Sequence, residues 1–70
     1  MAEKTDWEAR AANLLKAELK RKGVTYGHLA EIIGDKEANI RNKLSRGKFT
    51  AAFLLECLCA IGVGRIEIEP

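Results

Sequence analysis

Four glycines divide this chain of 70 residues into short segments, and their positions limit what the chain can fold into. Gly23, Gly34, Gly47 and Gly62 each follow a stretch in which apolar residues recur every three or four positions, as on one face of a helix. A glycine directly after such a stretch is typical of a helix that ends in a left-handed residue. The pattern predicts an all-α chain with four helices, at residues 5–22, 26–33, 36–45 and 51–61.

The residues in front of these segments are ones that cap helices. Thr5 and Glu8 have the spacing of a capping box, in which two side chains satisfy each other's backbone N–H groups. Thr25 and Thr50 stand directly before the second and fourth segments, and Asp35 precedes the third. Each predicted helix therefore begins where a side-chain oxygen can accept from its free N–H groups.

The apolar residues of the predicted helices form stripes that we expect to build one core. The third helix carries only a narrow seam, Ile40 and Leu44, so we expect it to dock by that seam and expose the rest. The other stripes are broader and consist of Trp7, Ala11, Leu14, Leu15 and Leu19, then Leu29, Ala30, Ile32 and Ile33, then Phe53, Leu54, Leu55, Cys57, Leu58, Ala60 and Ile61.

Composition excludes several functional classes. Cys57 and Cys59 stand two apart on a predicted helix, so their side chains point to different faces, and His28 is the single histidine. We therefore expect two free thiols, no metal and no cofactor. No apolar run resembles a signal peptide or approaches the roughly 20 residues of a membrane span. These features favour a cytoplasmic protein with no membrane or small-molecule partner.

Positive charge gathers on the third predicted helix. Residues 35–48 hold five basic side chains against two acidic ones, in a chain whose formal net charge is only +2. Lysine, arginine and asparagine are the side chains that contact phosphates and base edges, so this concentration is typical of a nucleic-acid interface. The candidate DNA-binding residues are Lys36, Glu37, Asn39, Arg41, Asn42, Lys43, Arg46 and Lys48.

The C-terminal segment changes its period from that of a helix to that of a strand. Apolar and charged residues alternate over 65–69, which predicts a short β-strand. The sequence contains no second strand to pair with it, so the segment is either a disordered tail or pairs antiparallel with a second copy about a two-fold axis. We favour a homodimer that brings Arg65 of one copy near Glu67 or Glu69 of the other. Its interface would comprise Arg65, Ile66, Glu67, Ile68 and Glu69.

The second and third predicted helices, with the glycine turn between them, match a helix-turn-helix. Ala30 is the small residue of the first helix, Gly34 makes the turn four residues later, and Ile40 follows as the buried residue of the second helix. With these positions, residues 14–63 resemble the lambda-repressor-like (XRE/Cro) class of DNA-binding domains. The resemblance implies that residues 1–70 form a single four-helix domain of this class with a short C-terminal strand.

Two positions depart from the pattern of that class. Asp35 follows the turn glycine where an apolar residue is usual, and Lys43 stands where an apolar residue is expected, with Leu44 one place later. Either the third helix is rotated, or its end is one residue longer.

A closer resemblance links the chain to a family of short bacterial proteins that is described only as a domain of unknown function. The shared runs are residues 14–21 and residues 39–53. The second run is long and specific, but that family brings no established activity with it.

The resemblance to repressors implies that the third helix enters the major groove of double-stranded DNA with its first residues leading. Base edges or adjacent phosphates would then be contacted by Lys36, Glu37, Asn39 and Lys43, while Arg46 and Lys48 hold the backbone. Because one such motif makes few contacts, we expect a homodimeric transcriptional regulator.

Two other functional classes compete with DNA binding as interpretations of this sequence. A protein-interaction module on the same fold is the alternative, which the near-neutral net charge of +2 favours. An enzyme is not expected, because the sequence has one histidine, no glycine-rich phosphate loop and no paired carboxylates framed by a pocket.

Overall fold

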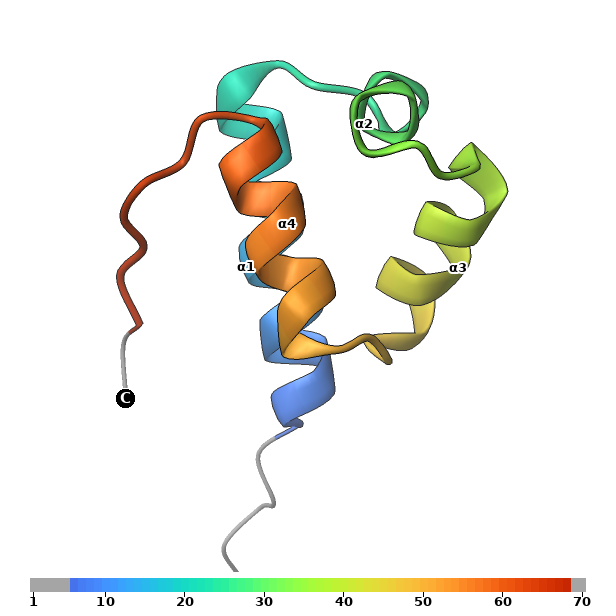
Figure 1. Cartoon of the computed structure of the whole chain (residues 1–70). Helices are drawn as coiled ribbons and strands as arrows, with labels where there is room; N and C mark the ends of the chain where they lie inside the picture. Colours follow the sequence, from blue (N-terminus) through green and yellow to red (C-terminus); the bar gives the residue numbers. More distant parts are fainter. Residues whose placement is uncertain (1–5, 69–70) are drawn as a thin grey trace, which may run out of the picture.

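The computed structural model describes residues 6–68, which form four helices and contain no β-strand (Figure 1). Helix α1 spans Trp7–Lys22, α2 spans Tyr26–Ile33, α3 spans Glu37–Arg46 and α4 spans Ala51–Ala60. The prediction of an all-α, four-helix chain is confirmed.

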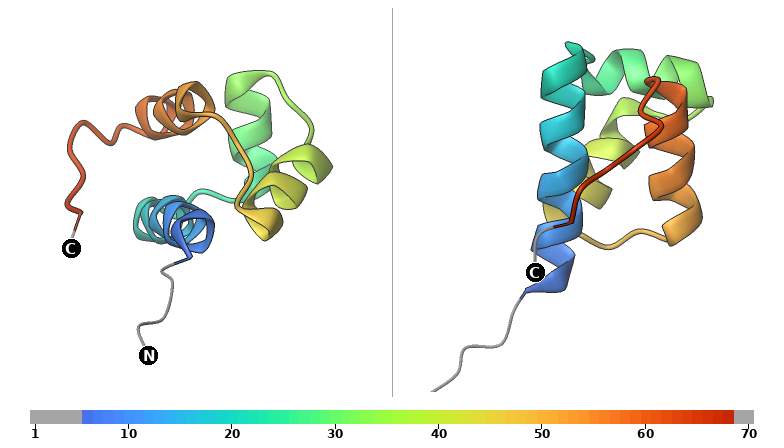
Figure 2. Two further views of the ribbon diagram at one scale, coloured as in Figure 1. Left: turned by 90° about the horizontal axis from the view of Figure 1, so that it is seen from below. Right: turned by 90° about the vertical axis from the view of Figure 1, so that its left-hand side faces the viewer.

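The helices enclose one apolar core. Helices α1 and α4 lie side by side, and α2 and α3 lie together on one side of that pair (Figure 2). Every helix contributes buried apolar side chains to the space between the helices. No buried polar or charged residue occurs in the described part of the chain. The core comprises Leu15, Leu19, Leu29, Ala30, Ile40, Leu44, Phe53, Cys57, Leu58, Ile61 and Val63.

Side-chain caps begin three of the four helices. Thr25 and Thr50 accept from the backbone N–H groups three residues later, at 3.1 and 3.0 Å. The cap of α1 is Asp6, whose Oδ1 accepts from a backbone N–H at 3.0 Å. The predicted capping box of Thr5 and Glu8 is therefore wrong, since the N-cap of α1 is one residue later, at Asp6. Thr5 itself lies outside the described residues.

Three apolar residues assigned to the core stripes are exposed, so those assignments are wrong. Leu55 is 61% exposed because it neighbours Leu54 on α4, and adjacent helical residues point in different directions. Ile32 is 45% exposed for the same reason, beside the half-buried Ile33. Trp7 is 62% exposed in the first turn of α1, and its ring packs against the Arg10 guanidinium, which lies 5.0 Å from the ring centroid.

The predicted C-terminal strand is not formed by residues 65–68, and Glu69 lies outside the described residues. After Val63, whose backbone N–H donates to the Leu58 carbonyl at 2.8 Å, the chain runs back beside α1 (Figure 2). Ile66 packs half-buried against the core from this segment. Within one chain, Ile66 thus covers part of the surface formed by α1 and α4, and residues 65–68 build no sheet.

The two cysteines are free and lie in different environments, as the sequence predicts. Cys57 is fully buried, and its removal from water raises the pKa of its thiol to about 11. The thiol therefore stays protonated at neutral pH and packs as a small apolar group. Cys59 is exposed on the outer side of α4.

The turn between α3 and α4 touches the backbone of α1. All four glycines that end the predicted helices have positive φ, but Gly47 is the one that is also buried, with φ of 68°. A Cβ atom at Gly47 would lie 2.5 Å from the carbonyl oxygen of Glu8. The absence of a side chain at this position is what lets the end of α3 rest on the start of α1.

The substitution Gly47→Ala is expected to lower the free energy of unfolding by about 3 kcal/mol or more, because it adds a backbone clash to left-handed strain. Gly23→Ala is the matched control, since Gly23 has φ of 69° with no atom within 4 Å of the added Cβ. The control is expected to cost about 1 to 2 kcal/mol. Urea denaturation followed by circular dichroism measures both, and equal losses would contradict the close packing of Gly47.

Candidate nucleic-acid interface

Helix α3 is attached to the core by two apolar side chains one helical turn apart. Ile40 is 0% exposed and Leu44 is 1% exposed, and they are the only buried residues of α3. The remaining residues from Glu37 to Arg46 lie partly or fully in solvent. The predicted seam is therefore confirmed, and one long face of the helix is left outside the core.

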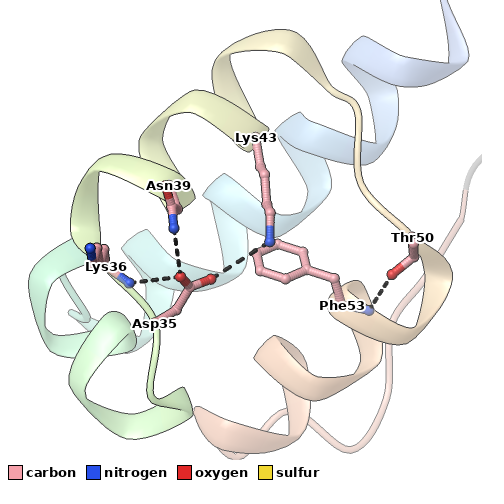
Figure 3. Close-up of polar contacts among 6 residues, drawn as sticks. All are labelled: Asp35, Lys36, Asn39, Lys43, Thr50 and Phe53. Carbon is pink, nitrogen blue, oxygen red and sulfur yellow. Dashed lines mark hydrogen bonds and ion pairs between the residues drawn. The ribbon is translucent and has the colours of Figure 1, made fainter.

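Asp35 organises the start of α3 (Figure 3). Its Oδ1 accepts from the backbone N–H of Lys36 at 2.7 Å and from Nδ2 of Asn39 at 3.0 Å. Its Oδ2 lies 3.6 Å from Nζ of Lys43. The prediction that Asp35 is the cap is wrong in position, since Lys36 occupies the N-cap without a side-chain cap bond. The carboxylate instead ties the turn to the first two turns of the helix.

These contacts favour the ionised form of Asp35. The hydrogen bond from Asn39 lowers the pKa of this carboxyl most, followed by the backbone N–H of Lys36, while the charge of Lys43 adds a smaller effect in the same direction. Partial removal from water opposes them without reversing the shift. The carboxyl group therefore carries a negative charge at neutral pH beside the N-terminus of α3, where the helix dipole also favours an anion.

Lys43 turns inward rather than outward. Besides Asp35, its ammonium group lies 4.3 Å from the centroid of the Phe53 ring on α4, an arrangement in which a cation is attracted to the face of the ring (Figure 3). This contact explains how a charged side chain is accommodated beside the core at this position. Leu44 takes the core position, and the stem of Lys43 bridges α3 and α4.

The outer face of α3 carries two pairs of side chains at helical spacing. Arg41 forms an ion pair with Glu37, and Nε of Arg46 donates to Oδ1 of Asn42 at 3.0 Å. The side chains of Arg41 and Glu37 are 58% and 50% exposed. Surface pairs of this kind contribute about 0.3 to 0.5 kcal/mol, so either arginine can exchange its partner for a phosphate at small cost.

Lys48 lies past the end of α3 and reaches toward the start of α1. Its Nζ lies 3.1 Å from Oε2 of Glu8, with the lysine side chain 68% exposed. The position follows from Gly47, which brings this turn against the backbone of Glu8. Lys48 thus extends the basic surface beyond the last turn of the helix.

The predicted site residues fall into two groups. Asn39 and Lys43 contact Asp35 through their side chains, and Lys36 contacts it through its backbone N–H. The other predicted residues are exposed and consist of Glu37, Arg41, Asn42, Arg46 and Lys48. Sequence reasoning missed the organising role of Asp35, although its spacing of four from Asn39 was a usable signal. The contacts of Phe53 and Glu8 had no local signal, because they depend on tertiary packing.

No group of three or more histidine, cysteine, aspartate or glutamate side chains within residues 6–68 is placed to hold a metal ion. In the same residues, no helix has the length and apolar character needed to cross a membrane.

These features define a small four-helix domain with a basic surface helix. Its sequence matches the family of the domain of unknown function DUF6471 over residues 7–66, and the chain belongs to that family. No curated protein and no solved structure is detectably similar to it.

The contribution of Asp35 to stability is expected to depend on pH. Because its folded-state pKa is depressed, the contribution is present above the unfolded pKa of about 3.9 and is lost as pH falls through the lower folded value. We expect Asp35→Asn to lower the melting temperature at pH 7, with a difference from wild type that shrinks below about pH 4. Thermal melts from pH 7 to 2 measure this difference, and parallel curves for the two proteins would contradict it.

Proposed function

We propose that this protein binds double-stranded DNA as a homodimeric transcriptional regulator, with α3 as the helix that enters the major groove. The observation that carries the proposal is the attachment of α3 by Ile40 and Leu44, which leaves the face that carries Arg41 and Arg46 outside the core. An α-helix fits the width of the major groove, where each base pair presents a distinct pattern of donors and acceptors.

The connection between α2 and α3 supports a helix-turn-helix. Ala30 is 5% exposed on α2, and its carbonyl accepts from the backbone N–H of Asp35 at 2.9 Å. Gly34 stands between them with φ of 73°, so the chain reverses over a few residues. A small buried residue followed by such a turn lets the second helix pack closely across the first. This geometry agrees with the resemblance to lambda-repressor-like domains.

The side chains of α3 would divide their roles along the helix. Lys36, Glu37 and Asn42 are exposed and would lie near base edges or adjacent phosphates. Arg41 and Arg46 would give up weak surface partners for phosphates. Lys43 is held between Asp35 and Phe53, so we assign it to the positioning of α3 rather than to base contact.

The proposal is tested by the salt dependence of binding to a labelled duplex of mixed sequence, measured by fluorescence anisotropy from about 50 to 200 mM salt. The double variant Arg41→Ala with Arg46→Ala is expected to reduce the slope of log K against log salt by about 1.8, since two phosphate contacts are removed. Its matched control is Lys16→Ala with Lys20→Ala, which removes two charges from exposed positions of α1 and should leave the slope nearly unchanged.

Circular dichroism checks that both double variants are folded. Absence of duplex binding by the wild-type protein at the lowest salt would contradict DNA binding. In that case α3 would serve the alternative function, a protein-interaction surface, and the same arginine variant should abolish capture of a protein partner while the control retains it.

A further inference from the structure

The C-terminal segment, residues 64–68, has a backbone edge that the other described residues leave open. Val63, the residue directly before this segment, donates its backbone N–H to the carbonyl of Leu58. Within the described part of the chain, no N–H or C=O group of residues 64–68 forms a backbone hydrogen bond. The segment therefore offers a free edge of donors and acceptors to another extended chain.

Residues 66–68 of this segment also cover part of a largely apolar groove that is lined by α1 and α4. Ile66 and Ile68 line a cavity of about 630 Å³ together with Trp7 and Leu14 of α1 and Leu54 of α4, and charged side chains such as Glu18 and Glu67 stand at its lining as well. Ile66 is half-buried there, but Ile68 is 69% exposed and Trp7 is 62% exposed. Large apolar side chains that remain exposed along a groove favour a further occupant.

The groove lies on the side of the molecule away from α3. In Figure 2, the segment runs beside α1 and α4, while α2 and α3 occupy the opposite side of that pair. A partner that docks on the groove therefore leaves the outer face of α3 unobstructed.

Charge complementarity points to a second copy of this chain as the occupant. In an antiparallel pair, residues directly opposite each other share a face. When the two-fold axis passes through Ile66, the two copies of Ile66 face each other and Arg65 stands opposite the partner's Glu67, twice by symmetry. If the axis passed through Glu67 instead, the two copies of Glu67 would face each other and their carboxylates would repel. If the axis passed between two residues, charged side chains of one copy would face apolar side chains of the other.

The same register provides room for Ile68. It places Ile68 opposite the partner's Gly64, and an added Cβ at Gly64 would meet no atom within 4 Å. The exposed isoleucine of each copy can therefore lie over the glycine of the other, on the face of the ribbon that covers the grooves.

We infer that two copies of this chain dimerise through an antiparallel ribbon of residues 64–68 that is centred on Ile66, paired by Arg65 with the partner's Glu67 and seated over the two α1–α4 grooves. The inference rests on the homodimer of the proposed function and specifies its interface and register. The strand absent from the single chain would form on association.

Charge reversal tests this register, because Arg65 and Glu67 are exposed and their replacement leaves the core intact. By sedimentation equilibrium of the full chain, Arg65→Glu and Glu67→Arg are each expected to raise the dimer dissociation constant about tenfold or more, since each creates two like-charge oppositions. The double variant R65E/E67R is expected to restore wild-type dimerisation. Controls are Lys16→Glu and Glu31→Arg, which make the same changes of charge on exposed positions of α1 and α2.

Mixing supplies a second test with the same proteins. An equimolar mixture of the R65E and E67R chains is expected to form heterodimers, because every opposed pair then carries opposite charges. Native mass spectrometry distinguishes the heterodimer from either homodimer, since the two variants differ in mass.

Three results would overturn the inference: a monomeric wild-type chain at about 100 μM, a dimer that is insensitive to both single reversals, or a double variant that stays dissociated. The last result would exclude the register centred on Ile66.

A monomer that still binds duplex through Arg41 and Arg46 would overturn the dimer interface alone. A dimer with the expected rescue pattern that binds no DNA would overturn the proposed DNA binding alone.

Discussion

The burial of Ile40 and Leu44 is the interaction on which the exposed surface of this protein depends. Two side chains on one helical stripe fix the rotation of α3 about its axis, because turning the helix by one residue would bring a charged side chain into the core. Two further contacts fix its ends. The Asp35 carboxylate holds the first turns, and the missing side chain of Gly47 lets the last turn rest on the backbone of Glu8. A helix with so narrow a seam needs such contacts to keep a defined orientation.

Acidic side chains around α3 explain how a basic helix occurs in a nearly neutral chain. Glu37 pairs with Arg41, and Glu8 pairs with Lys48. These surface ion pairs offset part of the positive charge of the free protein. Because such pairs contribute little to stability, the two cations can exchange their carboxylate partners for phosphates. Asp35 differs because three donors converge on it. Its carboxylate with Lys43 and Phe53 links α3 to α4, which makes this cluster structural although it stands within the basic surface.

The sequence predicts most of the helical framework because helix ends and apolar stripes depend on local rules. Capping threonines, glycines of positive φ and the seam of α3 all follow from spacing alone. The exposure of Trp7 and Leu55 could not be predicted, since periodicity does not show which edge of a stripe its neighbours cover. The same limit applies to Lys43, whose contact with Phe53 exists only once α4 packs beside α3. Alternation in residues 65–68 could not show that Ile66 packs against the core of its own chain while Ile68 stays exposed.

The position of the C-terminal segment has a consequence for how a dimer would present α3 to DNA. The segment and α3 lie on opposite sides of the α1–α4 pair (Figure 2). In an antiparallel ribbon whose two Ile66 side chains share a face, the two-fold axis stands perpendicular to the ribbon, so both α1–α4 grooves lie under that one face. The two α3 helices of the proposed dimer would therefore both lie on the side away from the ribbon. Two recognition helices on one side of a dimer are what two half-sites on one duplex require.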